Sequence, residues 1–122
     1  MSYSWQNASA SEVVIYQCVS LLCDYDKRLI DFIFDPKRPR IRKRAGILIE
    51  DAWGFSHGEQ LLIRAALDLW SGNGHLALWE MLETWDDATW ARFIRVIGEY
   101  RRLDGVLRRQ DEANAGEGSA PC

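Results

Sequence analysis

The sequence has few of the residues that build disulfide frameworks or metal sites. Its 122 residues include three cysteines, Cys18, Cys23 and Cys122, and two histidines, His57 and His75. Structural zinc sites and disulfide frameworks need more of these residues, in closer groups. The histidines flank one expected helix about 27 Å long, which is too far for a shared metal ion. We expect no cofactor and no metal site, and we expect Cys18 and Cys23 to be small buried residues of a reducing compartment.

Catalytic signatures are also missing. The chain has no Walker phosphate-binding loop, no G-x-G-x-x-G motif and no H-E-x-x-H motif. Asp86 and Asp87 are adjacent carboxylates, but carboxylates at a helix start usually serve the helix dipole. Paired catalytic carboxylates instead face each other across a site. Cys18 has no obvious histidine to activate it as a nucleophile. The sequence therefore predicts a protein that is not an enzyme.

Long hydrophobic runs are absent as well. No apolar stretch approaches the roughly 20 residues that a membrane-spanning helix needs. Residues 1–11, MSYSWQNASAS, lack the basic region followed by an apolar run that is typical of a signal peptide. We expect a cytoplasmic protein that does not bind membranes.

The clearest positive feature is residues 56–74, SHGEQLLIRAALDLWSGNG, which have the start and stop signals of a complete helix. Ser56 and Glu59 have the spacing of a capping box, and Gly72 suits the left-handed backbone that ends helices. Between them, apolar residues recur at the spacing of one helical face, and more of them widen that face. A helix that is apolar on most sides is buried. We predict a central buried helix at about residues 57–71.

Similar spacing predicts helices on either side of this segment, at residues 14–25, 26–34, 75–82 and 88–103. The first two form one helix or break near Asp24. We predict a compact all-α bundle of four to five helices, with one domain over residues 11–109. Residues 1–10 are expected to be flexible, and the polar residues 110–122 a disordered tail.

A long connection, residues 35–55, interrupts this pattern. Connections longer than about 12–15 residues are usually functional or disordered. The connection contains a short apolar run, residues 46–51, which is either a strand or a helical turn leading to Trp53. An isolated strand would need a partner that the sequence does not provide.

The first half of this connection is strongly basic, with six cations among the eight residues of segment 37–44: Lys37, Arg38, Arg40, Arg42, Lys43 and Arg44. The whole chain has a net charge of −3, but the remainder has nine basic residues against eighteen acidic ones. Arginine binds both phosphates and carboxylates. The segment therefore contacts nucleic acid, docks onto an acidic protein surface, or is a solvated loop. Because no aromatic residue interrupts it, stacking on single strands is disfavoured.

The chain contains six tryptophans, more than expected for its length. Each buried tryptophan removes roughly 150–250 Å² from water. We predict that Trp70, Trp79 and Trp90 are core residues, because they lie in helical patterns. Trp5 and Trp53 lie outside such patterns and are predicted to be surface anchors at a protein interface.

Residues 67–72, Leu-Asp-Leu-Trp-Ser-Gly, resemble the A-x-x-L-W-N-G signature of small helical proteins encoded by bacterial and phage mobile elements. The resemblance covers residues 14–74 and rests on the following counterparts: Asp26, Ile30, Phe34, Trp53, Gly54, Ser56, Arg64, Ala66, Leu69, Trp70 and Gly72. Ser71 replaces the usual Asn, and the basic segment is stronger than the pattern suggests. The resemblance implies a mobile-element origin and no particular activity.

These observations favour a non-enzymatic interaction protein, an accessory factor or an inhibitor of a larger host or phage assembly. Trp53 and the basic segment 37–44 are the expected binding residues, and an acidic protein surface is the expected partner. Nucleic-acid binding through the same segment is the alternative. The sequence gives no indication of the oligomeric state.

Overall fold

The computed structural model describes residues 5–119, with side chains described through Leu103. Within this range it contains six α-helices: α1 (Ala10–Leu22), α2 (Lys27–Ile33), α3 (Ala45–Asp51), α4 (His57–Ser71), α5 (Leu78–Thr84) and α6 (Asp87–Ser119). A 3-10 turn, η1 (Ala52–Gly54), follows α3. The predicted all-α fold is confirmed, with more helices than expected because the short α3 forms inside the long connection.

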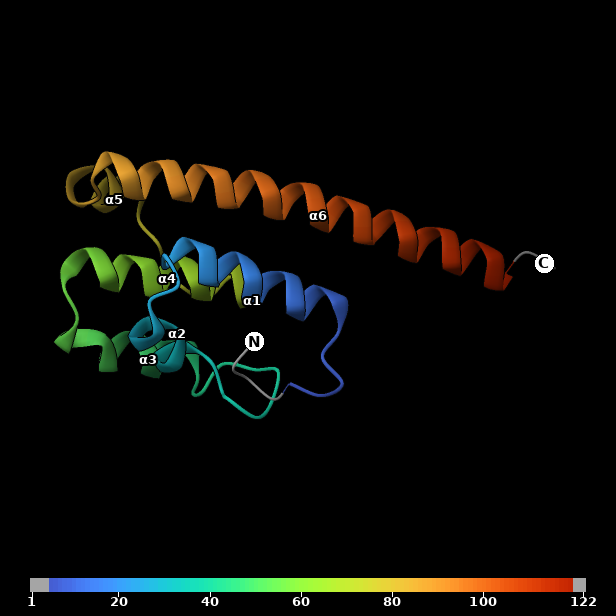
Figure 1. The fold of residues 1–122 in the computed structure, drawn as a ribbon, viewed down its shortest axis with the longest axis horizontal. Coiled ribbons are helices and arrows are strands. Elements are labelled where there is room, and N and C mark those ends of the chain that lie inside the picture. The colour runs from blue at the N-terminus through green and yellow to red at the C-terminus, as the bar shows by residue number, and fades with distance from the viewer. Residues whose placement is uncertain (1–4, 120–122) are drawn as a thin grey trace.

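Helix α4 lies at the centre of the molecule, as the sequence predicted. It contacts α1, α2, α3 and α5, while α6 lies along the other side of α1 (Figure 1). Leu61, Ile63 and Leu67 of α4 are at most 1% exposed. Helices α1 and α4 therefore form a middle layer between α6 and the pair α2 and α3.

The helix caps follow the sequence signals with one exception. Both capping boxes form, at Ser9 with Glu12 and at Ser56 with Glu59. The exception is the start of α6: the sequence suggests only that Asp86 serves the helix dipole, but the Thr89 N–H donates to the Asp86 carboxylate at 2.8 Å, so Asp86 caps the helix. Thr84 belongs to the last turn of α5. Threonine and aspartate compete as caps, and only the residue whose backbone is extended at the helix start takes the role.

The run at residues 46–51 is the helical turn, not the strand. In α3, Leu48 is 1% exposed, and Ala52 four residues later is 2% exposed. A helix places these two side chains on the same face, toward α4. The backbone also pairs within the helix, whereas an isolated strand would leave its N–H and C=O groups without partners.

Two tryptophans, Trp5 and Trp79, differ from their predicted positions. Trp5 is half-buried against Tyr16, Phe34 and Trp70, and its indole N–H donates to the Asp35 carbonyl at 2.6 Å. It is therefore no free surface anchor. Trp79 is 69% exposed rather than a core residue. Trp85, which follows α5, is the most buried tryptophan of the described residues.

The physical reason is the length of the short helices. A seven-residue helix such as α5 turns only one face toward the core, and Met81 occupies that face. Trp79 therefore points outward. Trp70 and Trp90 are partly buried and pack against the core, which agrees with their predicted place.

Helix α6 is longer than predicted. Its backbone is helical to Ser119, so residues 110–119 are helical where the sequence indicated a disordered tail. The segment contains the helix formers Gln, Glu and Ala, which extend a helix that has already been nucleated. In Figure 1 this part of α6 runs on beyond the end of α1. Residues 120–122 and residues 1–4 of the predicted flexible N-terminus lie outside the described range.

The turn after α4 depends on two glycines in different ways. Gly72 has φ 77°, in the left-handed region. Gly74 lies so close to α4 that a Cβ atom would stand 1.9 Å from the Arg64 carbonyl oxygen. The Gly74 and Leu76 N–H groups both donate to the Asp68 carboxylate, at 2.8 and 3.2 Å. This turn returns the chain along α4 toward α5.

Gly74→Ala should therefore destabilise the fold more than Gly72→Ala. We expect about 1–2 kcal/mol for Gly72→Ala, from left-handed backbone strain, and about 3 kcal/mol or more for Gly74→Ala, because backbone must shift. Gly46→Ala serves as the control, since a Cβ there meets nothing within 4 Å. Urea unfolding gives the three values, and an equal loss for Gly72→Ala and Gly74→Ala would contradict the close packing.

Candidate functional site

The basic segment 37–44 is a structured loop held by Asp35. The Asp35 carboxylate accepts the Lys37 and Arg38 N–H groups, at 2.8 and 3.1 Å. An antiparallel bridge pairs Phe34 with Ile41, and Asp35 N–H donates to the Arg40 carbonyl at 2.9 Å. The hydrogen bonds that the Asp35 carboxylate accepts, mainly the one from the Lys37 N–H, lower the pKa of Asp35. The loop is therefore closed at its base and keeps its basic tip in one arrangement.

All six basic side chains of the loop are exposed. Three of them make contacts within the chain. Arg40 pairs with Asp35 at 3.5 Å, Lys43 pairs with Asp51 at 3.0 Å, and Arg42 donates to the Asp31 carbonyl.

The other three loop cations remain available to a partner. Among the residues that the structure describes, the side chains of Lys37, Arg38 and Arg44 form no ion pair. The structure thus divides the predicted site into three cations that help to hold the loop and three that do not.

Trp53, the predicted anchor, is 83% exposed. It lies in η1, after α3, whereas the basic loop precedes α3. Helix α3 has seven residues and is about 10 Å long, so Trp53 and Arg44 stand at opposite ends of it. The Lys43–Asp51 ion pair spans the same helix. The two parts of the predicted site therefore flank α3 and do not form one cluster.

A pocket of about 500 Å³ adjoins the end of the loop, and no sequence pattern predicts it. Its wall combines Arg44 and Ile41 with residues from the end of α4 and the turn after it, among them Trp70, Asn73 and His75. Residues 41 and 75 are too far apart in the sequence for any spacing rule to connect them. The pocket places a free arginine beside an aromatic wall.

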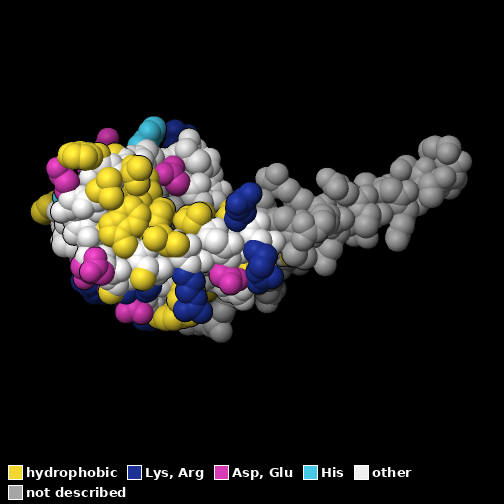
Figure 2. Space-filling model, turned by 90° about the horizontal axis from the view of Figure 1, so that it is seen from above, with side chains coloured by type: hydrophobic (Ala, Val, Ile, Leu, Met, Phe, Trp, Pro, Cys, Tyr) yellow, Lys and Arg dark blue, Asp and Glu magenta, His cyan; other side chains and the backbone are white. Residues whose placement is uncertain are grey.

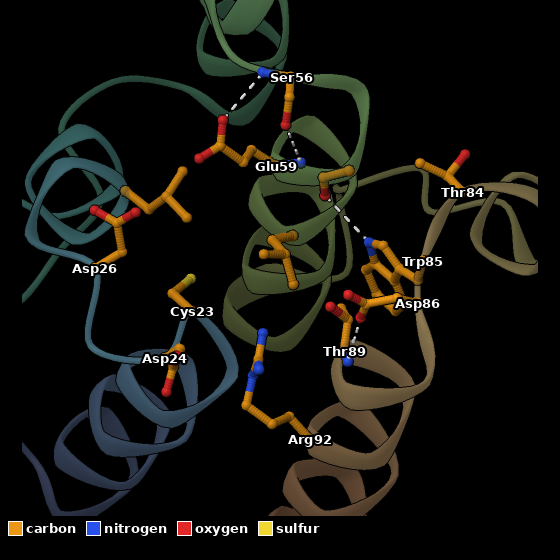
Figure 3. Close-up of a pocket in the computed structure, with 13 residues that line it drawn as sticks. Cys23, Asp24, Asp26, Ser56, Glu59, Thr84, Trp85, Asp86, Thr89 and Arg92 are labelled. Carbon is orange, nitrogen blue, oxygen red and sulfur yellow. Dashed lines mark hydrogen bonds between the residues drawn. The ribbon is translucent and has the colours of Figure 1, made fainter.

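A second pocket, of about 600 Å³, lies where α1 ends and α2, α4 and α6 begin (Figure 3). Its carboxylates are those of Asp24, Asp26, Glu59 and Asp86, with Cys23 and Arg92 between them. Arg28 pairs with Asp26 at 2.8 Å and with Glu59 at 2.6 Å. Three of these carboxylates, those of Asp26, Glu59 and Asp86, therefore serve the helix caps and ion pairs of the fold.

The pKa shifts in this pocket agree with that role. Arg28 lowers the pKa of Asp26, while the Ser56 N–H, and then Arg28, lower the pKa of Glu59. Burial raises the pKa of Cys23 to about 12, so its thiol is not a nucleophile near neutral pH. The pocket has the features of a helix junction, and its one thiol is not activated. Within the described residues, no group of His, Cys, Asp and Glu could hold a metal ion.

Another exposed surface is apolar and lies on α5 and the first half of α6. Figure 2 shows it as a broad yellow area. Its exposed side chains are Leu78, Trp79, Leu82, Ile94 and Ile97. The sequence analysis missed it, because helical spacing identifies an apolar face but does not reveal how much of that face a neighbour covers.

Comparison of the chain with protein-family models, curated proteins and solved structures found no significant match. The resemblance to mobile-element proteins therefore stays a prediction. No helix of the described residues has the length and apolar character needed to cross a bilayer.

The depressed pKa of Asp35 predicts how the loop responds to acid. Because its folded-state pKa lies below the unfolded value of 3.8, the carboxylate stabilises the fold above about that pH. This stabilisation is lost as pH falls through the folded-state pKa. Asp35→Asn removes the titrating group but keeps an amide oxygen that accepts the same N–H groups.

We therefore expect the unfolding free energy of wild type to fall more between pH 5 and pH 2 than that of Asp35→Asn. Urea unfolding at several pH values measures both slopes. Asp51→Asn is the control, since no backbone N–H donates to that exposed carboxylate among the described residues. Parallel slopes for wild type and Asp35→Asn would contradict the role assigned to Asp35.

Proposed function

We propose that this protein is a non-enzymatic interaction factor that docks onto an acidic surface of a protein partner. The basic loop 37–44 is the docking element and Trp53 an apolar anchor. The observation that carries the proposal is the loop itself: three exposed cations that form no ion pair with the described side chains, on a backbone closed by Asp35. In this proposal the protein is an accessory factor or inhibitor of mobile-element origin, and its partner belongs to a larger host or phage assembly.

Preorganisation makes the loop suitable for binding. A flexible loop loses conformational freedom when it docks, and that loss subtracts from affinity. Here the Phe34–Ile41 bridge and the Asp35 hydrogen bonds restrict the loop before binding. Arginine forks match the geometry of carboxylates, and exposed charges of one sign speed the encounter with a surface of the opposite sign.

Trp53 supports a protein partner over a nucleic acid. Tryptophan is enriched among the residues that dominate protein–protein binding energy. Trp53 and the loop lie at opposite ends of α3, about 10 Å apart. A single base held by the loop cations therefore does not reach the Trp53 indole. The buried thiols of Cys18 and Cys23 fit a reducing compartment, so we place the protein in the cytoplasm.

The loop is tested by reversing two of its free charges. Arg38→Glu with Arg44→Glu should leave thermal stability nearly unchanged, because neither side chain makes an ion pair within the described part of the chain. We expect capture of partners from a lysate of the source cells to fall at least tenfold. The control reverses two α6 arginines, Arg95→Glu with Arg102→Glu, which gives the same net charge of −7 from −3.

Partners that bind the control and the loop variant equally would contradict the proposal. A second arm measures binding to duplex DNA and to single-stranded RNA at low salt. If wild type binds either one tightly, with affinity that falls steeply as salt rises, the nucleic-acid alternative is favoured.

Trp53→Ala, tested in the same capture from lysate, should weaken partner binding without changing the unfolding temperature, because the side chain is 83% exposed.

A further inference from the structure

Helix α6 has apolar side chains on two sides, and α1 covers only one of them. Val96 is fully buried, and Phe93 and Tyr100 pack against the core beside it. Ile94 and Ile97 belong to the same helical turns but are 64% and 38% exposed. A solvated helix face normally carries polar residues. The uncovered side of α6 is therefore an exposed apolar surface suited to packing against another helix.

Helix α5 enlarges this surface. Leu78, Trp79 and Leu82 are each more than half exposed, and α5 lies beside the start of α6 (Figure 1). Figure 2 shows the combined apolar area, with dark-blue basic side chains toward the end where α6 leaves the body. Contiguous apolar surfaces of this kind mark interaction sites in soluble proteins.

The order of residues along α6 is the informative feature. Asp87, Trp90, Ile94, Ile97 and Arg101 follow one another at intervals of 3, 4, 3 and 4 residues. This spacing places all five on one face of the helix, as in the seam of a coiled coil. The face begins with an acid and ends with a base. Asp87 and Arg101 are exposed, and neither forms an ion pair with another described residue.

Such a face matches a second copy of itself when the two helices run in opposite directions, because the acid of one then meets the base of the other. If two copies pack their α6 helices antiparallel, about a two-fold axis near Ile94, the acidic start of each meets the basic end of the other. Asp87 then lies opposite Arg101 of the other copy, while Trp90, Ile94 and Ile97 cover each other. A symmetric dimer requires one patch that matches itself in this way.

We propose that this chain forms an antiparallel homodimer through the α6 face Asp87–Arg101 and the exposed side chains of α5. The long α6 supports a second copy over an unrelated partner. Its 33 residues extend about 50 Å, past the end of α1. In the antiparallel pair, this extension passes beside α5 of the other copy, where Trp79 is exposed. A helix segment gains stability in water from such packing. The dimer is independent of the proposed docking loop.

The apolar part of the interface is tested with Ile94→Glu combined with Ile97→Glu. Wild type should have the mass of two chains by light scattering and by sedimentation equilibrium, and the variant should have the mass of one chain. Ile47→Glu is the matched control, because Ile47 is also exposed, at 44%, but lies on α3. Circular dichroism checks that all three proteins remain helical.

A charge exchange tests whether the partner is a second copy in this orientation. Asp87→Arg and Arg101→Glu each place like charges opposite one another in a homodimer, so each variant alone should dissociate at least tenfold more readily. The double variant restores opposite charges and should recover the wild-type dimer. An equimolar mixture of the two single variants should form a heterodimer. In it, position 87 of each chain again faces a side chain of opposite charge at position 101 of the other chain.

A monomeric wild type at a concentration of a few hundred micromolar would overturn the proposal. A dimer that persists in the Ile94→Glu, Ile97→Glu variant would do the same. Single charge variants that fail to form the heterodimer would overturn the antiparallel orientation. The loop variant Arg38→Glu with Arg44→Glu should still dimerise, so a failed docking experiment and a failed dimer are distinguishable.

Discussion

The burial of α4 is the constraint on which the rest of the structure depends. The helix is apolar on most sides, and Leu61, Ile63 and Leu67 are removed from water almost completely. Each such side chain contributes roughly 1.5–3 kcal/mol when it is buried. Exposure of any face of α4 would lose part of this energy, so α1, α2, α3 and α5 all pack against it. Helix α6 packs mainly against α1, and this leaves Ile94 and Ile97 exposed.

The functional consequences follow from this arrangement. Helix α3 packs against α4 through Leu48 and Ala52, which fixes the basic loop at one of its ends and Trp53 at the other. Asp35 and the Phe34–Ile41 bridge close the loop near the core. The carboxylates of Asp26, Glu59 and Asp86 around the pocket of Figure 3 are engaged in caps and ion pairs. Among the described residues, the exposed features that the fold leaves uncovered include the loop, Trp53 and the α5–α6 face.

Sequence patterns identified the local features well. Ser9, Ser56 and Gly72 act as their types and spacings indicated, because capping depends on residues within one or two turns. The run at residues 46–51 does not distinguish strand from helix, since a short apolar run fits both. The tryptophans were harder to assign. Trp79 is exposed and Trp5 is partly buried because long-range packing, not the local pattern, determines which face of a segment meets the core.

The sequence by itself determined that the fold is helical, where its central helix lies, and that the cations cluster before α3. These properties depend on side-chain type and spacing along the chain. The tertiary structure alone decided which loop cations keep free side chains, that Ile41 and His75 share a pocket, and that Ile94 and Ile97 of α6 are exposed. Those properties depend on which segments meet in space, and residues distant in the sequence carry no local signal of their contacts.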